Sequence, residues 1–214
     1  MSKEYSMKRV VESILNCTKC QLCKYRRKPV PGEGPLDTEI MLIGEAPGAS
    51  EDEEGRPFVG AAGKLLTELL EKNNISRSSV YITNIVKCRP PGNRDPEESE
   101  INACLPYLIE QISIIKPKII VTLGRHAGRV IYKLMGKSFQ SMSREHGRVV
   151  KGVIRQLGLD VTVIPTYHPA AALYKPDVRR ILEEDFKKIR SLITSSKTIS
   201  KSGSITLDVF LKKG

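Results

Sequence analysis

Short apolar runs rich in β-branched residues alternate along this chain with longer segments of helical periodicity. Such runs are typical of strands that are buried on both faces of a parallel sheet. The four runs are EIMLIG (39–44), VYITNIV (80–86), KIIVTLG (118–124) and VTVIPTY (161–167). Residues 147–160, before the fourth run, are ambiguous and compatible with a small hairpin.

Helical segments separate the apolar runs. They carry a single apolar stripe or the signals of helix ends, such as acids in the first turn and glycine after the last. The segments are 61–73, 96–115, 125–136 and 176–193. Because strand and helix alternate, we predict an α/β fold, a three-layer sandwich with a central four-stranded parallel sheet flanked by helices.

The chain after Ile193 is dominated by Ser, Thr, Lys and Gly. A segment of this composition buries too little apolar surface to fold alone. We therefore predict one folded domain over residues 1–195 and a flexible tail over residues 196–214.

The net charge points to a partner. The chain has 214 residues and a formal charge of +11, which favours a polyanionic ligand, although a merely soluble basic protein has the same property. The N-terminus lacks the apolar core of a secretory signal, and no apolar run approaches the roughly 18 residues of a membrane span. We expect a cytoplasmic monomer without membrane contact, in which disulfides are rare.

Three unusual segments follow the predicted strands. They are GEAPGASEDEEGRPFVG (44–60), NIVKCRPPGNRDP (84–96) and HPAAALYKP (168–176). Ligands of open parallel sheets bind outside the carboxyl ends of the strands. We therefore expect the functional site to be built from these segments.

The five cysteines form a ligand pattern. Cys17, Cys20 and Cys23 follow one another at C-x-x-C spacing, and Cys88 and Cys104 lie further along the chain. Four thiolates can hold a structural zinc ion or an iron–sulfur cluster, and spacing does not separate the two. A free thiol is plausible for Cys23, the odd member of the set.

Several motifs together resemble the type 4 uracil-DNA glycosylases of thermophilic bacteria and archaea. They are NCTKC (16–20), GEAPG (44–48), EEGRPFVG (53–60), YITNIVKCRPP (81–91) and YHPA (167–170). The resemblance extends from about Asn16 to Tyr174. It implies a DNA repair enzyme that flips uracil out of single- or double-stranded DNA, hydrolyses its N-glycosidic bond and leaves an abasic site.

The resemblance also implies the cofactor and the substrate contacts. A [4Fe–4S] cluster would be held by Cys17, Cys20, Cys88 and Cys104, with Cys23 outside the set. Four further residues would act on the base: His168 as hydrogen-bond donor to uracil O2, Asn84 as reader of N3–H and O4, Phe58 as stacking partner, and Glu51 as the residue near C5 that excludes thymine.

The attacking water needs a group that holds it. The best-known uracil-DNA glycosylases place an aspartate where this chain has Ala46, so the adjacent Glu45 is the candidate catalytic carboxylate, and backbone carbonyl groups are the alternative. The backbone N–H groups of the motif that begins at Gly44 are candidates for contacting the base or a phosphate. For the apolar wedge that presses on the duplex we predict Leu173, with Tyr174 second, although the aligned position is Ala172.

Two further expectations concern basic residues. Lys87 and Lys175 lie near the predicted site, but nothing in the sequence marks either as desolvated, so we predict hydrolysis without a lyase step. The basic stretch 24–28 beside the cysteines suits phosphate contacts or, alternatively, is a solvated loop. The main alternative function is a non-catalytic iron–sulfur or zinc module that binds nucleic acid or senses redox state. Another is a glycosylase for a different base, such as hypoxanthine.

The tail carries one more pattern. Leu207, Phe210 and Leu211 are spaced i, i+3 and i+4 and would share one face of a helical turn. This resembles the peptide by which many repair proteins bind the sliding clamp, although Ser204 replaces the usual glutamine. Docking of these residues on the enzyme's own surface is the alternative.

Overall fold

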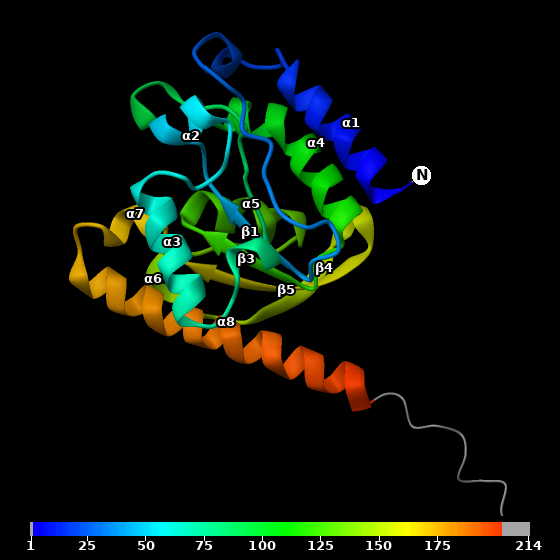
Figure 1. Ribbon diagram of the computed structural model, residues 1–214, viewed down its shortest axis with the longest axis vertical. Coiled ribbons are helices and arrows are strands. Elements are labelled where there is room, and N and C mark those ends of the chain that lie inside the picture. The colour runs from blue at the N-terminus through cyan, green and yellow to red at the C-terminus, as the bar shows by residue number, and fades with distance from the viewer. Residues whose placement is uncertain (1, 203–214) are drawn as a thin grey trace, which may run out of the picture.

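A single sheet forms the centre of the computed structural model, with strand order β2–β1–β3–β5–β4 (Figure 1). The strands are β1 (Ile40–Gly44), β2 (Tyr81–Asn84), β3 (Ile119–Leu123), β4 (Val150–Ile154) and β5 (Leu159–Thr166). The structure describes residues 2–202, with side chains described as far as Thr194. The four predicted strands are parallel neighbours, as expected for continuous apolar runs.

The sheet has five strands, so the prediction of four was wrong by one. The ambiguous segment forms the suggested hairpin, in which β4 pairs antiparallel with β5 at the edge of the sheet. Along β4, Lys151 and Val153 are exposed while Ile154 is buried. An edge strand that faces solvent on one side lacks the continuous apolar run by which the inner strands were found.

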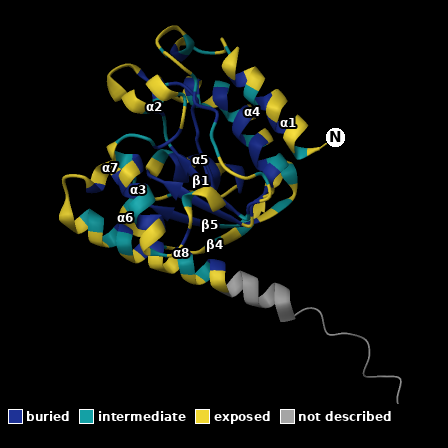
Figure 2. Ribbon diagram, viewed as in Figure 1, coloured by how far each residue is buried: buried dark blue, intermediate teal, exposed yellow. Residues whose placement is uncertain are grey.

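Helices cover both faces of the sheet in three layers (Figures 1 and 2). One face carries α1, α4 and α5, which share a buried cluster with the side chains of Met41, Tyr81 and Val163. The other face carries α3 and α8, which pack against Leu42 and Ile82. The helices are α1 (Lys3–Leu15), α2 (Ala49–Glu54), α3 (Ala61–Lys72), α4 (Glu98–Ile115), α5 (Arg125–Leu134), α6 (Met142–Glu145), α7 (Pro169–Ala172) and α8 (Pro176–Ser202).

The first and last helices differ from expectation. Helix α1 was not predicted, although its buried residues Met7, Val10 and Ile14 have helical spacing and Ser2 caps its N-terminus. Helix α8 continues to Ser202, past its expected end at residue 193. The residues of the clamp hypothesis, Leu207, Phe210 and Leu211, lie outside the described part of the chain, and that hypothesis stays a prediction. Within the described range, no helix is long and apolar enough to cross a membrane.

The strand order brings the predicted site together. From β1 the chain moves to β2, whereas from β3 it moves in the opposite direction toward β5, so the strand order reverses between β1 and β3. Crevices at such a switch point are where ligands of α/β sheets bind. Gly44 at the end of β1 is in register with Asn84 at the end of β2, and His168 follows β5.

Candidate active site

The floor of the site lies where β1 and β2 end. A Cβ atom on Gly44 would collide with Asn84 Oδ1 and would lie 2.6 Å from Phe58 Cζ. Any larger residue here would displace either the amide or the ring. Glycine at position 44 therefore lets Asn84 and Phe58 approach each other.

Asn84 carries an unsatisfied acceptor. Its side chain is 1% exposed, and within the described structure Oδ1 is buried without a hydrogen-bond partner. Leaving a buried acceptor unpaired costs roughly 1–3 kcal/mol. A buried amide oxygen that faces a pocket is therefore suited to accept a hydrogen bond from a bound ligand.

Phe58 is held in an unusual conformation beside this amide. Its φ is 52°, in the left-handed region, and its ring is 6% exposed. The ring stacks on the imidazole of His168, with centroids 5.6 Å apart and planes at 29°. The Phe58 backbone packs closely against the start of α3. A Cβ on Gly63 would collide with the Phe58 carbonyl group, so glycine at position 63 permits this close approach.

Glu51 braces the loop that carries Phe58. One of its carboxylate oxygens accepts hydrogen bonds from Val59 N–H and Gly60 N–H, at 2.9 and 2.8 Å. The other accepts from Gly48 N–H at 3.1 Å. The side chain also lines the pocket, so a contact with a bound base and the bracing of the loop are compatible roles for this one carboxylate.

His168 is held as a neutral hydrogen-bond donor. Its Nδ1 accepts from Ala170 N–H at 3.2 Å, so the ring proton of the neutral imidazole belongs on Nε2. Burial lowers the pKa of His168 to about 4, and Glu51 only partly opposes this shift. The imidazole is therefore neutral at pH 7, with one N–H available to a ligand.

These residues surround one pocket of about 290 Å³. Of the predicted residues, Glu45, Ala46, Glu51, Phe58, Asn84 and His168 line it, and Gly44 lies beneath. Asn93 and Arg94 also line the pocket, although neither was predicted as a site residue. Both belong to the segment that follows β2, and the φ of 55° at Asn93 marks a tight turn there.

Glu45 belongs to a group of ionisable side chains at the pocket. Ligand atoms of Glu45, Asp95 and His126 all lie within 4.8 Å of one another. Asp95 is paired with Arg125 and lies 3.3 Å from His126 Nε2. Burial is the main cause that raises the pKa of Glu45. His126 had no predicted role, because its proximity to Glu45 arises only from the fold.

The segment after His168 presents apolar side chains to solvent. Leu173 is 38% exposed and Tyr174 is 89% exposed, whereas Ala172 is 4% exposed and packs in the core. A wedge has to project from the surface. Leu173 and Tyr174 are exposed enough to act as a wedge and Ala172 is not, and the assignment of the wedge stays a prediction.

The cysteines gather at a second place, between α1, α4 and the segment after β2. All five line one cavity, which we call the cysteine cavity. In the described structure, no three of these sulfurs all lie within 4.8 Å of one another. Four thiolates gathered at one place can hold a zinc ion or an iron–sulfur cluster.

Hydrogen-bond donors point at the cysteine sulfurs. Arg26 Nη1 donates to Cys88 Sγ at 3.1 Å, and Lys87 N–H donates to Cys104 Sγ at 3.2 Å. Burial raises the pKa of Cys104 to about 11, and that of Cys88 is also raised by burial. Such donors stabilise thiolate ligands. Arg26 is thereby turned inward, so the basic stretch 24–28 offers fewer side chains to phosphate than expected.

Lys87 contradicts the expectation that nothing marks it as desolvated. It is 1% exposed, and burial lowers its pKa to about 8. Its Nζ donates to Thr83 Oγ1, the Asn84 carbonyl oxygen and Gln111 Oε1, at 2.6, 2.7 and 2.8 Å. No local pattern signals this burial, because Gln111 comes from α4 while Thr83 and Asn84 belong to β2.

Comparison with known proteins adds a family to this geometry. A sequence profile of the Uracil DNA glycosylase superfamily matches residues 31–191. The type-4 uracil-DNA glycosylase of Sulfurisphaera tokodaii is 53% identical over 207 residues, which cover 96% of this chain and 90% of that protein. The type-4 enzyme of Saccharolobus solfataricus is 51% identical and covers 94% and 90%. That of Thermotoga maritima is 44% identical and covers 90% and 97%.

Proposed function

Because the chain belongs to the type 4 group of the uracil-DNA glycosylase superfamily, we propose that the strand-end pocket receives a uracil base flipped out of DNA. The enzyme hydrolyses the N-glycosidic bond and leaves an abasic site, the first step of base excision repair. Flipping is required because the bond is out of reach in a stacked duplex. We call this pocket the uracil pocket.

The unpaired Asn84 Oδ1 is the observation that carries the proposal. Uracil presents N3–H as a donor beside the O4 acceptor, and an amide offers the complementary acceptor and donor. Cytosine has an acceptor at N3 and a donor at N4, so it would leave the buried amide oxygen facing a lone pair. Asn84 is therefore suited to select uracil.

His168 supplies the stabilisation of the leaving group. As the C1′–N1 bond breaks, its electron pair passes to uracil, and negative charge develops on the base. The neutral imidazole donates Nε2–H to this charge, and a preorganised donor of this kind lowers the barrier. Phe58, which lies against both His168 and the floor of the pocket, stacks on the flipped base.

Uracil-containing oligonucleotides test the function directly. Incubation of single- and double-stranded substrates followed by alkaline cleavage should give strand scission at uracil and none at cytosine. Asn84→Asp should release uracil more slowly and gain measurable cytosine release, because a carboxylate accepts from N4–H. Intact uracil strands after wild-type treatment would reject the function. Cytosine strands left intact by Asn84→Asp would reject only the assignment of Asn84.

Glu45 is proposed to orient and deprotonate the attacking water. A water between Glu45, Asp95 and His126 can lie within about 2.8 Å of all three, which is a hydrogen-bond distance. The water oxygen bonds to C1′ and its proton passes to the Glu45 carboxylate. An oxocarbenium-like sugar is strongly electrophilic, so a modest base is sufficient.

Replacing this base should change the pH dependence. Glu45→Gln is expected to lower the single-turnover rate by about 10- to 100-fold. In the wild type the rate should fall as pH falls through the raised pKa of Glu45, because the base becomes protonated. Glutamine does not titrate, so this acid limb should disappear. Glu39→Gln, at the opposite end of the sheet beside Lys118, is the control. An unchanged acid limb in Glu45→Gln would remove Glu45 from this role.

The absence of a lyase step remains part of the proposal, on new grounds. None of the described residues that line the uracil pocket is a lysine. Lys87 is buried but directs Nζ toward three protein oxygens, and Lys175 is exposed. Among the described residues, we therefore expect no lysine to attack C1′.

The cysteine cavity is proposed to hold a [4Fe–4S] cluster through Cys17, Cys20, Cys88 and Cys104. The gathering of the cysteines in one cavity and the two donors directed at the sulfurs support this assignment. When bound, the cluster serves as a rigid structural link, since hydrolysis transfers no electron. Cys23 also lines the cavity but lies outside the proposed ligand set.

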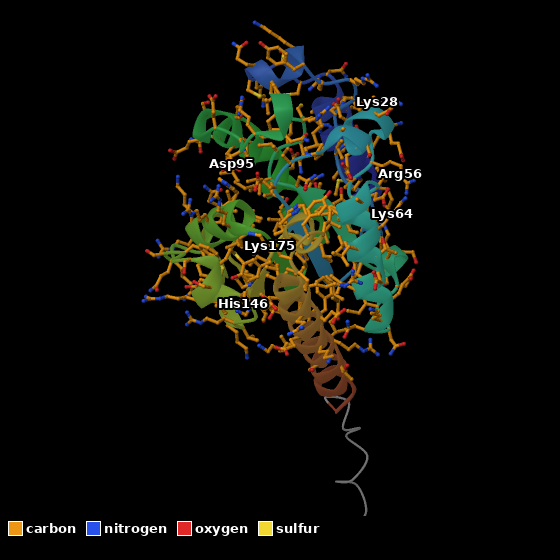
Figure 3. The ribbon with its side chains drawn as sticks, turned by 90° about the vertical axis from the view of Figure 1, so that its left-hand side faces the viewer. Lys28, Arg56, Lys64, Asp95, His146 and Lys175 are labelled. Carbon is orange, nitrogen blue, oxygen red and sulfur yellow. The ribbon has the colours of Figure 1, made fainter. Side chains whose placement is uncertain are left out.

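DNA is proposed to lie across the side of the molecule shown in Figure 3. Lys28, Arg56, Lys64 and Lys175 are spread over this face. The three lysines are suited to phosphate contacts, whereas Arg56 is paired with Glu33. The proposed wedge is the exposed Leu173, two residues before Lys175 in the chain. Binding of the tail to the sliding clamp remains a prediction from sequence.

A further inference from the structure

Lys87 is a buried cation whose Nζ is held by uncharged oxygens. It is 1% exposed, and the three partners of its Nζ in the described structure are a hydroxyl, a peptide carbonyl and a side-chain amide. Lysine is almost never fully buried unless it is paired. Burying an ammonium group costs free energy, so we expect Lys87 to have a role. The proposed hydrolysis at the uracil pocket does not use this side chain.

The three partners of Nζ show how the side chain is held. The Asn84 carbonyl oxygen can only accept, and Thr83 Oγ1 directs its own proton to the Pro31 carbonyl oxygen at 2.8 Å. Gln111 donates its amide N–H to the same Pro31 oxygen at 2.9 Å, so its Oε1 faces Lys87 as an acceptor. Three acceptors around one nitrogen match the three donors of an ammonium group.

These contacts join two sites. Through Nζ, Lys87 holds the peptide group of Asn84, whose side chain reads the base. Through its backbone N–H, it holds Cys104 Sγ in the cysteine cavity. Gln111 and Cys104 both belong to α4, so one helix contacts both ends of Lys87.

We propose that Lys87 is a positioning residue for uracil recognition, which fixes the end of β2 so that Asn84 Oδ1 points into the pocket and connects this strand end to the cysteine cavity. The inference rests on the proposed role of Asn84. The Asn84 side chain has little freedom of its own, since Gly44 and Phe58 lie against it. The orientation of the Asn84 side chain is therefore set by the Asn84 backbone, and Lys87 Nζ is hydrogen-bonded to the carbonyl oxygen of that backbone.

A double-mutant cycle tests this role. Lys87→Met keeps the length of the side chain and removes all three hydrogen bonds, and its single-turnover rate on uracil DNA should fall by about 10- to 100-fold. In an Asn84→Ala background the same change should cost less than about threefold, because the group it positions is already gone. Lys118→Met, an exposed lysine at the far end of the sheet, should match the wild type.

Iron content and DNA affinity separate positioning from general damage. Both should stay within about twofold of wild type in Lys87→Met. If that variant loses iron or fails to fold, Thr83→Val decides instead, since it preserves shape and removes one acceptor of Nζ together with the hydroxyl's bond to Pro31. It should slow the reaction about 3- to 10-fold and be equally silent beside Asn84→Ala.

Two results would overturn the inference. One is a wild-type rate in Lys87→Met. The other is a cycle in which the losses multiply, which would mean that Lys87 supports the whole pocket and not Asn84. A wild-type enzyme that releases no uracil would instead reject the proposed function itself, so the two failures are distinguishable.

Discussion

Replacement of His168 by alanine is expected to slow the release of uracil by about 10²- to 10³-fold under single-turnover conditions. The loss is expected because the neutral Nε2–H donates to charge that exists only in the transition state. DNA affinity should therefore stay close to wild type. Since the pKa of His168 is held near 4, the deficit should be the same at pH 5.5 and pH 8.

The control for His168 is His146, a histidine outside the uracil pocket. His146 is paired with the buried Asp185 and does not line the uracil pocket, so His146→Ala should stay within about threefold of wild type. A deficit in His168→Ala that shrinks as pH rises would indicate that an imidazolium acts in the wild type. A rate equal to wild type would show that His168 does not stabilise the leaving group.

Cys88→Ala is expected to abolish the cofactor. Cys88 is 6% exposed and receives the Arg26 hydrogen bond, so its loss removes a ligand and leaves a partly buried cation without its partner. Purified wild-type protein should be brown and contain iron, whereas Cys88→Ala should be colourless with little bound metal. Metal analysis and visible absorbance measure both properties.

Cys23→Ala is the matched control for Cys88→Ala. It removes a thiol that lines the same cavity but is outside the proposed ligand set, so colour and iron should be retained. Equal loss of iron in the two variants would show that the ligand set is wrong. Stoichiometric zinc without iron in the wild type would show that the cofactor is wrong.

Much of the fold was predictable because the inner strands are buried on both faces. A run such as KIIVTLG has no polar interruption, and its strand formed within one residue of each predicted end. Strand β4 was only suggested, since Lys151 and Val153 face solvent and break the pattern. Helix α1 was missed although its apolar spacing and Ser2 cap were present in the sequence.

Some residues of the candidate site were predictable from sequence motifs, and others were not. The residues brought together at the uracil pocket come from motifs with fixed positions at strand ends, so their proximity was expected. The burial of Lys87 and the contact of His126 with the Glu45 group depend on elements distant in sequence, and no local pattern signals them. The gathering of the five cysteines in one cavity likewise depends on the fold, because Cys88 and Cys104 are distant in sequence from the other three.

The bracing of the Phe58 loop by Glu51 has a consequence for how substrates are chosen. Both carboxylate oxygens already accept hydrogen bonds from backbone N–H groups. Opening or closing the loop over a base would break these bonds, so we expect the loop to keep its conformation. The protein then loses little conformational entropy on binding, and most of the free-energy cost of binding comes from flipping the base out of the DNA. The ease with which each DNA context unpairs and unstacks, and not a motion of the enzyme, would then rank uracil in single strands and mismatches ahead of uracil in stable pairs.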